Sequence, residues 1–167
     1  IFKYYKNKQE LFIAVVDRFW FSTQNPRNKF TETNSTFAEF IDEYVRGVQR
    51  TMDMLGDLIG ADRDKVAQGK FTYHAQYFHF LFQLLQYDPD AKEKLRNLVE
   101  VDYAYWRAAI QRAIATGELR EDVDVEEAVV MFRQVYMGLS FEMSFLGGLN
   151  TEKLSKHLHA VYSLLKR

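Results

Sequence analysis

The stretch IFKYYKNKQELF, residues 1–12, reads as the end of one short helix, a tight turn and the capped start of a second helix. Asn7 is a residue type that caps helices, and Glu10 follows three positions later, where its carboxylate can reach back to the backbone N–H of the cap. An apolar stripe at helical spacing then begins at Leu11. The junction also carries five basic or phenolic side chains: Lys3, Tyr4, Tyr5, Lys6 and Lys8. Such a mixture suits contacts to phosphate oxygens.

This segment resembles the end of the DNA-binding helix-turn-helix in the TetR family of bacterial transcriptional regulators, where an aromatic-rich "L-Y-Y-Y/H-F" precedes "K-x-K-E-E-L-F". The chain departs from that pattern at Lys3, where an aromatic is common, and at Gln9, which replaces the first acid. The resemblance implies that four of these side chains contact DNA phosphate: Lys3, Tyr4, Lys6 and Lys8. The alternative is an ordinary amphipathic helix start with solvated lysines.

A second resemblance to the same family lies at residues 110–124, IQRAIATGELREDVD, which looks like the "G-E-L-R-x-D-x-D" turn before the last two helices of many members. Residues of these types are also common wherever one helix ends and the next begins. Because the chain starts without Met inside the first motif, the earlier helices of the DNA-reading head are expected outside these residues. The resemblance divides the chain into a remnant of the DNA-binding domain with its connecting helix (1–24) and a ligand-binding and dimerisation domain (25–167).

The composition favours one helical domain with a substantial core. Hydrophobic residues make up 47% of the 167 residues, while two prolines and eight glycines suit long helices with short connections. No apolar run is long enough to cross a membrane, so no membrane partner is expected. The absence of cysteine excludes disulfides and cysteine-based metal sites, and is compatible with the expected cytoplasmic location.

Charge is distributed unevenly along the chain. The formal net charge is −1, yet residues 1–29 hold six basic and two acidic side chains, against 16 basic and 21 acidic side chains in the rest. A positive end on a mildly acidic body fits a two-part DNA regulator. Uneven scatter of surface charge would give the same pattern.

Caps and apolar stripes predict an all-α fold, namely a TetR-type C-terminal regulatory domain preceded by the remnant of a helix-turn-helix. The expected helices are 8–23, 37–59, 71–87, 89–116, 125–146 and 151–166, with a loop at 60–70. The expected helix-boundary signals are Thr36 with Glu39, Asp88 with Pro89, Gly117, Asp124 with Glu127, Gly147 with Gly148, and Thr151. No period-two alternation competes with them.

The expected helix 125–146 is apolar nearly all round, so it must be buried on several sides. In the family, the last two helices pair with those of a second subunit, which implies a twofold homodimer through 125–146 and 151–166. The candidate interface residues are Val129, Phe132, Tyr136, Phe141, Leu154, Leu158, Val161 and Leu165. A central helix in a monomer is the alternative.

Aromatic residues are too numerous in the helix 71–87 to share one face, and the two following helices add more. Aromatic walls with a few phenol hydroxyls suit a mainly apolar or aromatic small molecule. The candidate pocket residues are Tyr77, Phe78, Phe82, Tyr103, Trp106, Met131 and Tyr136. Such stripes are also typical of plain core.

The sequence lacks the patterns that enzymes need. The histidines are not spaced as metal ligands, no Glu-x-x-His pair or Gly-x-Ser-x-Gly occurs, and residues 60–70 lack the phosphate-loop spacing. We expect no catalytic residues, no metal and no cofactor. The favoured function is a ligand-responsive repressor whose homodimer binds palindromic double-stranded operator DNA and is released by a small effector. A helical ligand-binding or scaffold module without DNA binding is the alternative.

Overall fold

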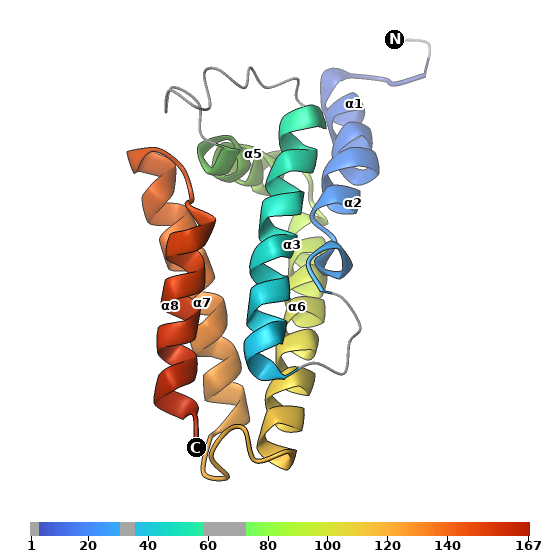
Figure 1. Ribbon diagram of the computed structural model, residues 1–167. Coiled ribbons are helices and arrows are strands. Elements are labelled where there is room, and N and C mark those ends of the chain that lie inside the picture. The colour runs from blue at the N-terminus through green and yellow to red at the C-terminus, as the bar shows by residue number, and fades with distance from the viewer. Residues whose placement is uncertain (1–3, 31–35, 59–72) are drawn as a thin grey trace.

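The computed structural model describes residues 4–30, 36–58 and 73–167, without the side chains of residues 58, 73 and 74 (Figure 1). These parts of the chain form helices and no sheet, which confirms the all-α prediction. Leu119 and Lys166 form an isolated bridge. The predicted loop at 60–70 lies outside the described residues, as does Lys3.

The helices follow the predicted order. α1 (Lys8–Val15), a π-helical segment (Val16–Trp20) and α2 (Phe21–Thr23) run on without a break and make up the first predicted helix. A short 3₁₀ turn (Pro26–Asn28) follows, and the remaining helices are α3 (Phe37–Leu58), α5 (Tyr73–Tyr87), α6 (Ala91–Ala115), α7 (Val125–Leu146) and α8 (Thr151–Leu165). Among the described residues, no helix combines the length and the apolar character needed to cross a bilayer.

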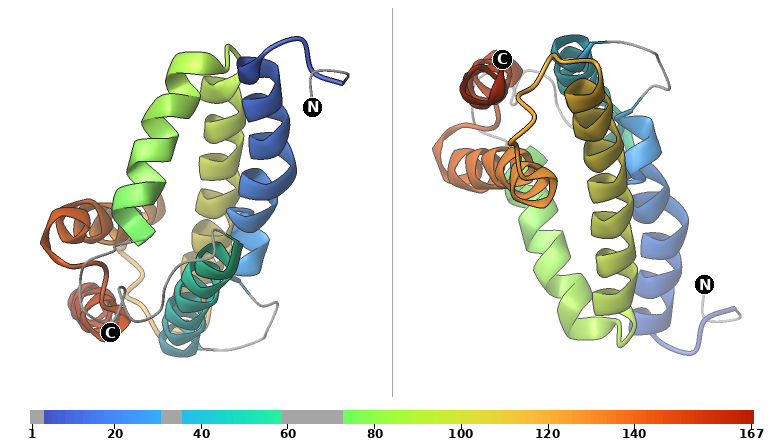
Figure 2. Two further views of the ribbon diagram at one scale, coloured as in Figure 1. Left: turned by 90° about the horizontal axis from the view of Figure 1, so that it is seen from above. Right: turned by 90° about the horizontal axis from the view of Figure 1, so that it is seen from below.

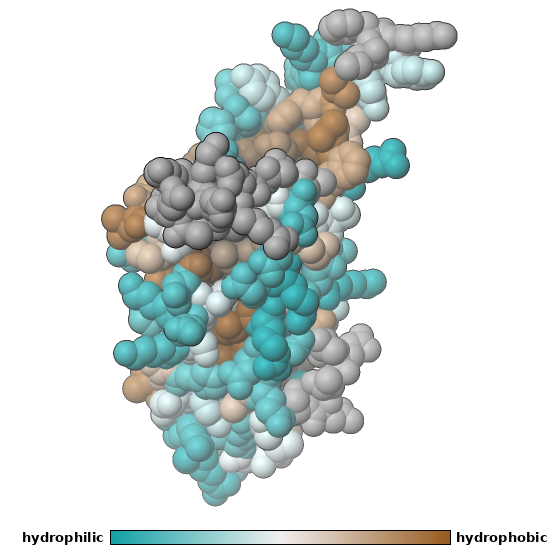
Figure 3. Space-filling model, turned by 45° about the horizontal axis from the view of Figure 1, so that its top comes forward, coloured by the Kyte–Doolittle hydropathy of each residue, from teal (hydrophilic) through white to brown (hydrophobic). Residues whose placement is uncertain are grey.

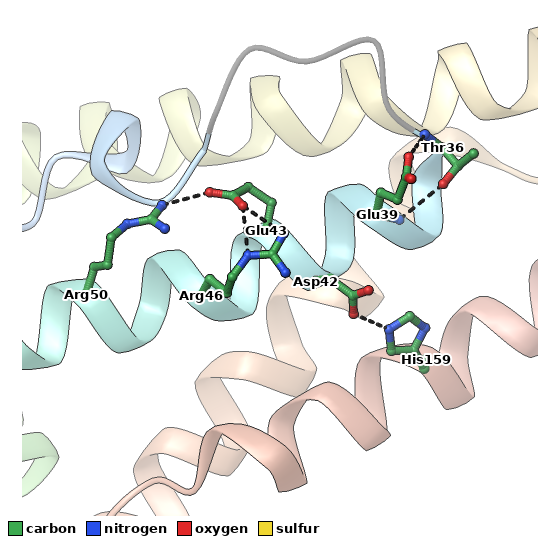
Figure 4. Close-up of polar contacts among 7 residues, drawn as sticks. All are labelled: Thr36, Glu39, Asp42, Glu43, Arg46, Arg50 and His159. Carbon is green, nitrogen blue, oxygen red and sulfur yellow. Dashed lines mark hydrogen bonds and ion pairs between the residues drawn. The ribbon is translucent and has the colours of Figure 1, made fainter.

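Two of the predicted capping boxes can be checked atom by atom. At α3, the backbone N–H of Glu39 donates to Thr36 Oγ1 (3.2 Å) and the N–H of Thr36 donates to Glu39 Oε2 (2.9 Å), which confirms the box (Figure 4). At α1, Asn7 Oδ1 accepts from the N–H of Glu10 (2.8 Å) as predicted. The Glu10 carboxylate, however, accepts from the N–H of Lys6 (2.6 Å), one residue before the predicted donor.

Two predicted N-terminal caps were wrong, at α6 and at α8. α6 begins at Ala91 rather than Pro89, because Asp88 lies in the preceding turn, where its carboxylate accepts from the N–H of Asp90 (3.0 Å) and pairs with Lys94 (2.9 Å). α8 is capped by Asn150, whose side chain accepts from the N–H of Lys153 (2.8 Å). Thr151 is the first helical residue instead.

The helices enclose two cores of unequal size. The larger core lies between α3, α6, α7 and α8, with Trp106 fully buried and stacked on Phe132 (ring centroids 4.9 Å apart). The smaller core gathers around Val16, Trp20 and Leu84, between the helix 8–23, α5 and α6. Figures 1 and 2 show α7 and α8 together on one side of the molecule, and α1 beside α6 on the other. The two cores therefore meet inside the molecule, near the middle of α6.

The turn G-E-L-R at 117–120 ties three helices together. Gly117 ends α6 with a positive φ of 77°, a conformation that favours glycine. The Glu118 carboxylate accepts from the backbone N–H groups of Phe37 (2.7 Å) and Ala38 (3.2 Å), so it satisfies free donors at the start of α3. It also accepts from the Tyr162 hydroxyl of α8 (3.0 Å). The motif thus has a specific structural role in addition to marking a helix end.

Charged side chains on the outer face of α3 pair with each other and with α8. Figure 4 shows Glu43 between Arg46 and Arg50, and Asp42 directed toward His159. The Asp42 Oδ1 and His159 Nε2 atoms lie 2.7 Å apart. Near the other end of α8, the Thr151 hydroxyl donates to Gln49 Oε1 (3.1 Å). α8 is therefore held against α3 by polar contacts along its length.

Candidate functional site

A cavity of about 150 Å³ lies where the two cores meet; it is partly open to solvent and is bordered by the loop after α2 and by α5, α6 and α7. Its apolar lining consists of Pro26, Leu81, Leu95, Leu98, Val99 and Met137. Its polar lining consists of Gln24, Lys29, Tyr77, Asp102 and Arg133. A cavity of this size has room for a single aromatic ring. A mainly apolar wall with a few polar groups is the usual composition of a small-molecule site.

A buried ion pair forms part of the cavity wall. Nε of Arg133 on α7 lies 2.7 Å from Oδ2 of Asp102 on α6, and both side chains are almost fully enclosed. The two groups are not aligned for a hydrogen bond, and Nη1 of Arg133 has no hydrogen-bond partner among the described residues. The pair joins α6 to α7 and leaves part of the guanidinium's hydrogen-bonding capacity unused.

Lys29 places a second cation at the cavity. Its side chain is buried, with only 6% of the residue exposed, and it forms no ion pair with a described acidic side chain. Nζ lies 5.0 Å from the centroid of the Tyr136 ring, while the Arg133 guanidinium lies 5.5 Å from the same centroid. Burial lowers the pKa of the Lys29 ammonium, and the charge of Asp102 partly opposes this. The site thus contains two basic groups and one acidic group.

A close backbone contact fixes the position of Lys29. A Cβ atom placed on Gly47 of α3 would lie 2.3 Å from the Lys29 carbonyl oxygen and 2.4 Å from its Cα, so only glycine permits this approach. The loop that carries Lys29 can therefore lie directly on α3. This contact holds the lysine over the cavity rather than in solvent.

Buried phenol groups surround the charged residues. Burial raises the pKa of Tyr44, Tyr77 and Tyr136, so these hydroxyls stay protonated at neutral pH and can donate hydrogen bonds. Tyr77 lines the cavity and also a smaller neighbouring one of about 20 Å³, which has room for one water molecule. Tyr136 lines the smaller cavity. The region offers neutral donors in addition to its charges.

The helix 8–23 connects the cavity to the N-terminal basic residues. Lys94 of α6 pairs with Asp17 (2.7 Å) and holds this helix against α6, and Gln9 Nε2 donates to the carbonyl of Tyr87 (2.6 Å) at the end of α5. The chain passes from the C-terminal end of this helix directly into Gln24, which lines both cavities. A molecule in the cavity would therefore contact the segment that follows this helix.

The predicted pocket residues lie in different environments in the structure. Tyr77 and Tyr136 line the described cavities, while Phe78 is buried and packs edge-on against Tyr77. Four others line neither cavity: Phe82, Tyr103, Trp106 and Met131. Phe82 and Met131 are 59% and 40% exposed, and Trp106 fills the centre of the larger core. Tyr103 is half-buried against the larger core. The assignment of these four residues to a ligand pocket therefore stays a prediction.

Sequence reasoning missed four polar residues of the cavity: Gln24, Lys29, Asp102 and Arg133. Two of them carried a usable signal. Asp102 precedes Trp106 by four residues and Ala109 by seven, which places a carboxylate on the buried face of its helix. Arg133 interrupts an otherwise apolar stretch of α7. Charged residues are rarely buried without a partner, so these two positions indicated a paired site.

Half of the predicted interface residues belong to the core of their own protomer. Val129, Phe132, Leu154 and Leu158 have no exposed surface, so their assignment to a dimer interface is corrected. Tyr136 faces the smaller cavity. Phe141 is 44% exposed, and Val161 and Leu165 are half-buried. Other apolar side chains of α7 and α8 are exposed instead: Val130, Met131, Phe145, Leu146 and Leu164.

The predicted phosphate-contacting residues that can be placed lie at the exposed N-terminal end of the helix 8–23. Tyr4, Lys6 and Lys8 are exposed, and neither lysine forms an ion pair with another described residue. Lys8 is the first residue of α1, where the free N–H groups of the helix favour an anion. Within the parts of the chain that the structure describes, no three acidic or histidine side chains are arranged to hold a metal ion.

The comparisons with known proteins agree with this arrangement of helices. The family model described as "Tetracyclin repressor-like, C-terminal domain" matches residues 48–141, which is more than half of the chain. The matched range includes three polar residues of the cavity wall: Tyr77, Asp102 and Arg133. No curated protein and no solved structure matches the chain.

Proposed function

Because this chain belongs to the TetR family of transcriptional regulators, we propose that it is a cytoplasmic repressor whose homodimer binds a palindromic operator. A small, mainly apolar or aromatic effector in the cavity would release the DNA. The observation that carries the proposal is the position of Gln24, which lines the cavity and directly follows the helix that begins at Lys8. Residues 1–24 would then act as the end of the DNA reader with its connecting helix, and residues 25–167 as the effector-binding and dimerisation domain.

The helix 8–23 is the proposed link between effector and DNA. Two helix-turn-helix readers of a dimer must reach successive major grooves about 34–36 Å apart, so a shift of this helix changes how well they fit. Effector and DNA would each favour a different arrangement of the same dimer. Binding of either one would therefore lower the affinity of the dimer for the other. The contacts of Lys94 with Asp17 and of Gln9 with Tyr87 would define the unliganded position.

Replacing Lys8 by Ala is expected to weaken binding of the complete gene product to DNA of any sequence. Loss of one phosphate contact should reduce the slope of log affinity against log salt by about one. Fluorescence anisotropy across a salt series, with DNA from upstream of the gene and a scrambled duplex, measures both effects. Arg112→Ala, a change to an exposed basic residue in the last turn of α6, is the matched control. An unchanged slope for Lys8→Ala would remove its assigned role, and equal binding of both duplexes would favour the scaffold function.

The proposed dimer surface is the outer face of α7 together with α8, the two helices that lie on one side of the molecule (Figures 1 and 2). Val130, Phe141 and Phe145 are exposed along α7 at helical spacing. Gly138 lies between them, and a Cβ atom there would meet nothing within 4 Å in its own protomer. Exposed apolar side chains in such a row are typical of an interface, and the missing side chain lets a second helix approach closely.

A second apolar region belongs to a different part of the surface. Figure 3 shows hydrophobic residues gathered in the upper part of that view, where α1 and α5 lie, above a mainly hydrophilic lower part. Exposed apolar residues of the helix 8–23 and of α5 include Val15, Phe19, Phe82 and Leu85. This region provides control positions for testing the α7–α8 surface.

Replacing Phe141 by Glu is expected to weaken self-association at least about tenfold, because a carboxylate would be buried without a partner in the dimer. Sedimentation equilibrium of the 167-residue chain measures the dissociation constant. Phe19→Glu is the matched control, since Phe19 is 43% exposed and Phe141 is 44% exposed in the protomer. Circular dichroism checks that both variants remain folded. A monomeric parent protein, or equal effects of the two substitutions, would contradict the proposed interface.

A further inference from the structure

We propose that the effector is an anion, namely a small carboxylate whose apolar part is about the size of one aromatic ring. Its carboxylate would be bound by Lys29 and Arg133, and its ring by the leucines of α5 and α6. The regulatory role of this ligand rests on the proposed function, whereas its binding rests on the cavity alone.

The charge balance of the cavity carries this inference. Arg133 is paired with Asp102 through Nε, and no other acidic side chain among the described residues lines the cavity. Lys29 forms no ion pair with any described residue, although it is buried. Burying an unpaired charge is costly, and this cost lowers the pKa of the Lys29 ammonium. A bound anion would offset the cost and stabilise the charged form. A bound carboxylate would supply one negative charge against an excess of one positive charge.

Other ligand charges fit less well. A neutral ligand would leave Lys29 without a partner and would displace the water that can solvate it. A cation would add to the existing excess, because Asp102 is already paired. A dianionic phosphate would convert an excess of one positive charge into an excess of one negative charge. A monoanion is the only one of these classes that leaves the site neutral.

Unused hydrogen-bond donors agree with the same class of ligand. Nη1 of Arg133 has no hydrogen-bond partner among the described residues, and the Lys29 ammonium has three donors that no described acidic group accepts. Tyr77 adds a neutral hydroxyl and Gln24 an amide to the same wall. A carboxylate has two oxygens that can accept from several of these groups at once.

The remaining wall sets the size and polarity of the rest of the ligand. Pro26, Leu81, Leu95, Leu98 and Met137 are apolar, and the volume of about 150 Å³ has room for one ring. Lys29 lies a few residues after the helix 8–23 and is held on α3 at Gly47. A charge bound by Lys29 therefore acts on the segment that joins the cavity to the DNA-proximal helix.

A charge series on one ring tests this inference without DNA. Benzoate, benzamide and benzamidine have similar shapes and carry a negative, a neutral and a positive group. Ligand-observed NMR titrations of the 167-residue chain give their affinities. We expect benzoate to bind at least about tenfold more tightly than benzamide, and benzamidine to bind most weakly.

Two lysine variants identify the group responsible. Lys29→Met should abolish the preference for benzoate over benzamide while it leaves the affinity for benzamide nearly unchanged. Lys153→Met, at an exposed position of α8, should retain the preference. Thermal unfolding should show that Lys29→Met is at least as stable as the parent, because it removes an unpaired buried charge. Lys29→Gln repeats the test if the methionine variant does not fold.

Equal affinities for benzoate and benzamide would overturn the inference, as would tighter binding of benzamidine than of benzoate. A preference for benzoate that survives in Lys29→Met, or the failure of every one of the three compounds to bind, would also overturn it. These outcomes are independent of the proposed function. Failure to bind operator DNA would leave a measured benzoate preference intact, whereas normal DNA binding without that preference would overturn only the anionic effector.

Discussion

Asp102→Asn is expected to lower the free energy of unfolding by about 3–5 kcal/mol, the range found when one partner of a buried ion pair is removed. The change leaves the buried Arg133 and Lys29 with no acidic group among the described lining residues to compensate them. Most of the loss is the cost of these two uncompensated charges rather than of the missing contact. Urea denaturation followed by circular dichroism measures it.

Two controls separate burial from the mere loss of a carboxylate. Glu126→Gln removes the acid from an exposed pair with Arg107, so it should leave the free energy of unfolding nearly unchanged. The double variant Asp102→Leu with Arg133→Met replaces the buried pair by apolar side chains and should recover much of the stability. Equal losses for Asp102→Asn and Glu126→Gln would contradict the buried site described above.

Trp106→Ala is expected to lower the free energy of unfolding by about 3–5 kcal/mol, since the substitution leaves a large void in the main core. The indole is fully buried, stacks on Phe132 and meets Tyr44 edge-on at 4.9 Å. Trp106→Phe keeps an aromatic ring and should lose clearly less. The same denaturation experiment measures both variants.

The Trp106 variants also separate a core role from a role in ligand binding. If Trp106 were a wall of the effector site, Trp106→Phe would change the affinity for benzoate while the protein stayed stable. The structure leads to the opposite expectation, because Trp106 lines neither described cavity. A stable Trp106→Ala variant that binds no benzoate would contradict this assignment.

Local features of the fold could be predicted because their causes lie within a few residues. Thr36 and Glu39 form their capping box, and Asp124 accepts from the N–H groups of Glu126 (3.0 Å) and Glu127 (3.1 Å) as the spacing indicated. Gly147 and Gly148 end α7 with positive φ angles of 137° and 94°. The errors at Asp88 and Thr151 arose where a second residue of a capping type lies close by, Asp90 in the first case and Asn150 in the second.

The polar residues of the candidate site could not be grouped from the sequence. Its polar groups come from the loop after α2, from α5, from α6 and from α7. No spacing within one segment relates them, so aromatic and apolar content alone led to Phe82 and Met131, which are exposed. The buried-face positions of Asp102 and the polar break at Arg133 were visible, but their pairing requires α6 and α7 to lie side by side.

The sequence by itself determined the class of fold, the order of the helices, most of their ends and the family, because caps, turns and apolar stripes act over short distances. Only the tertiary structure decided which apolar faces became core, since α7 is apolar on more than one side and the sequence offers no choice between them. It also decided that Lys29 and Arg133 share one cavity with Asp102. That arrangement depends on the close approach of a loop to Gly47 and on the packing of distant helices, which are properties of the whole chain.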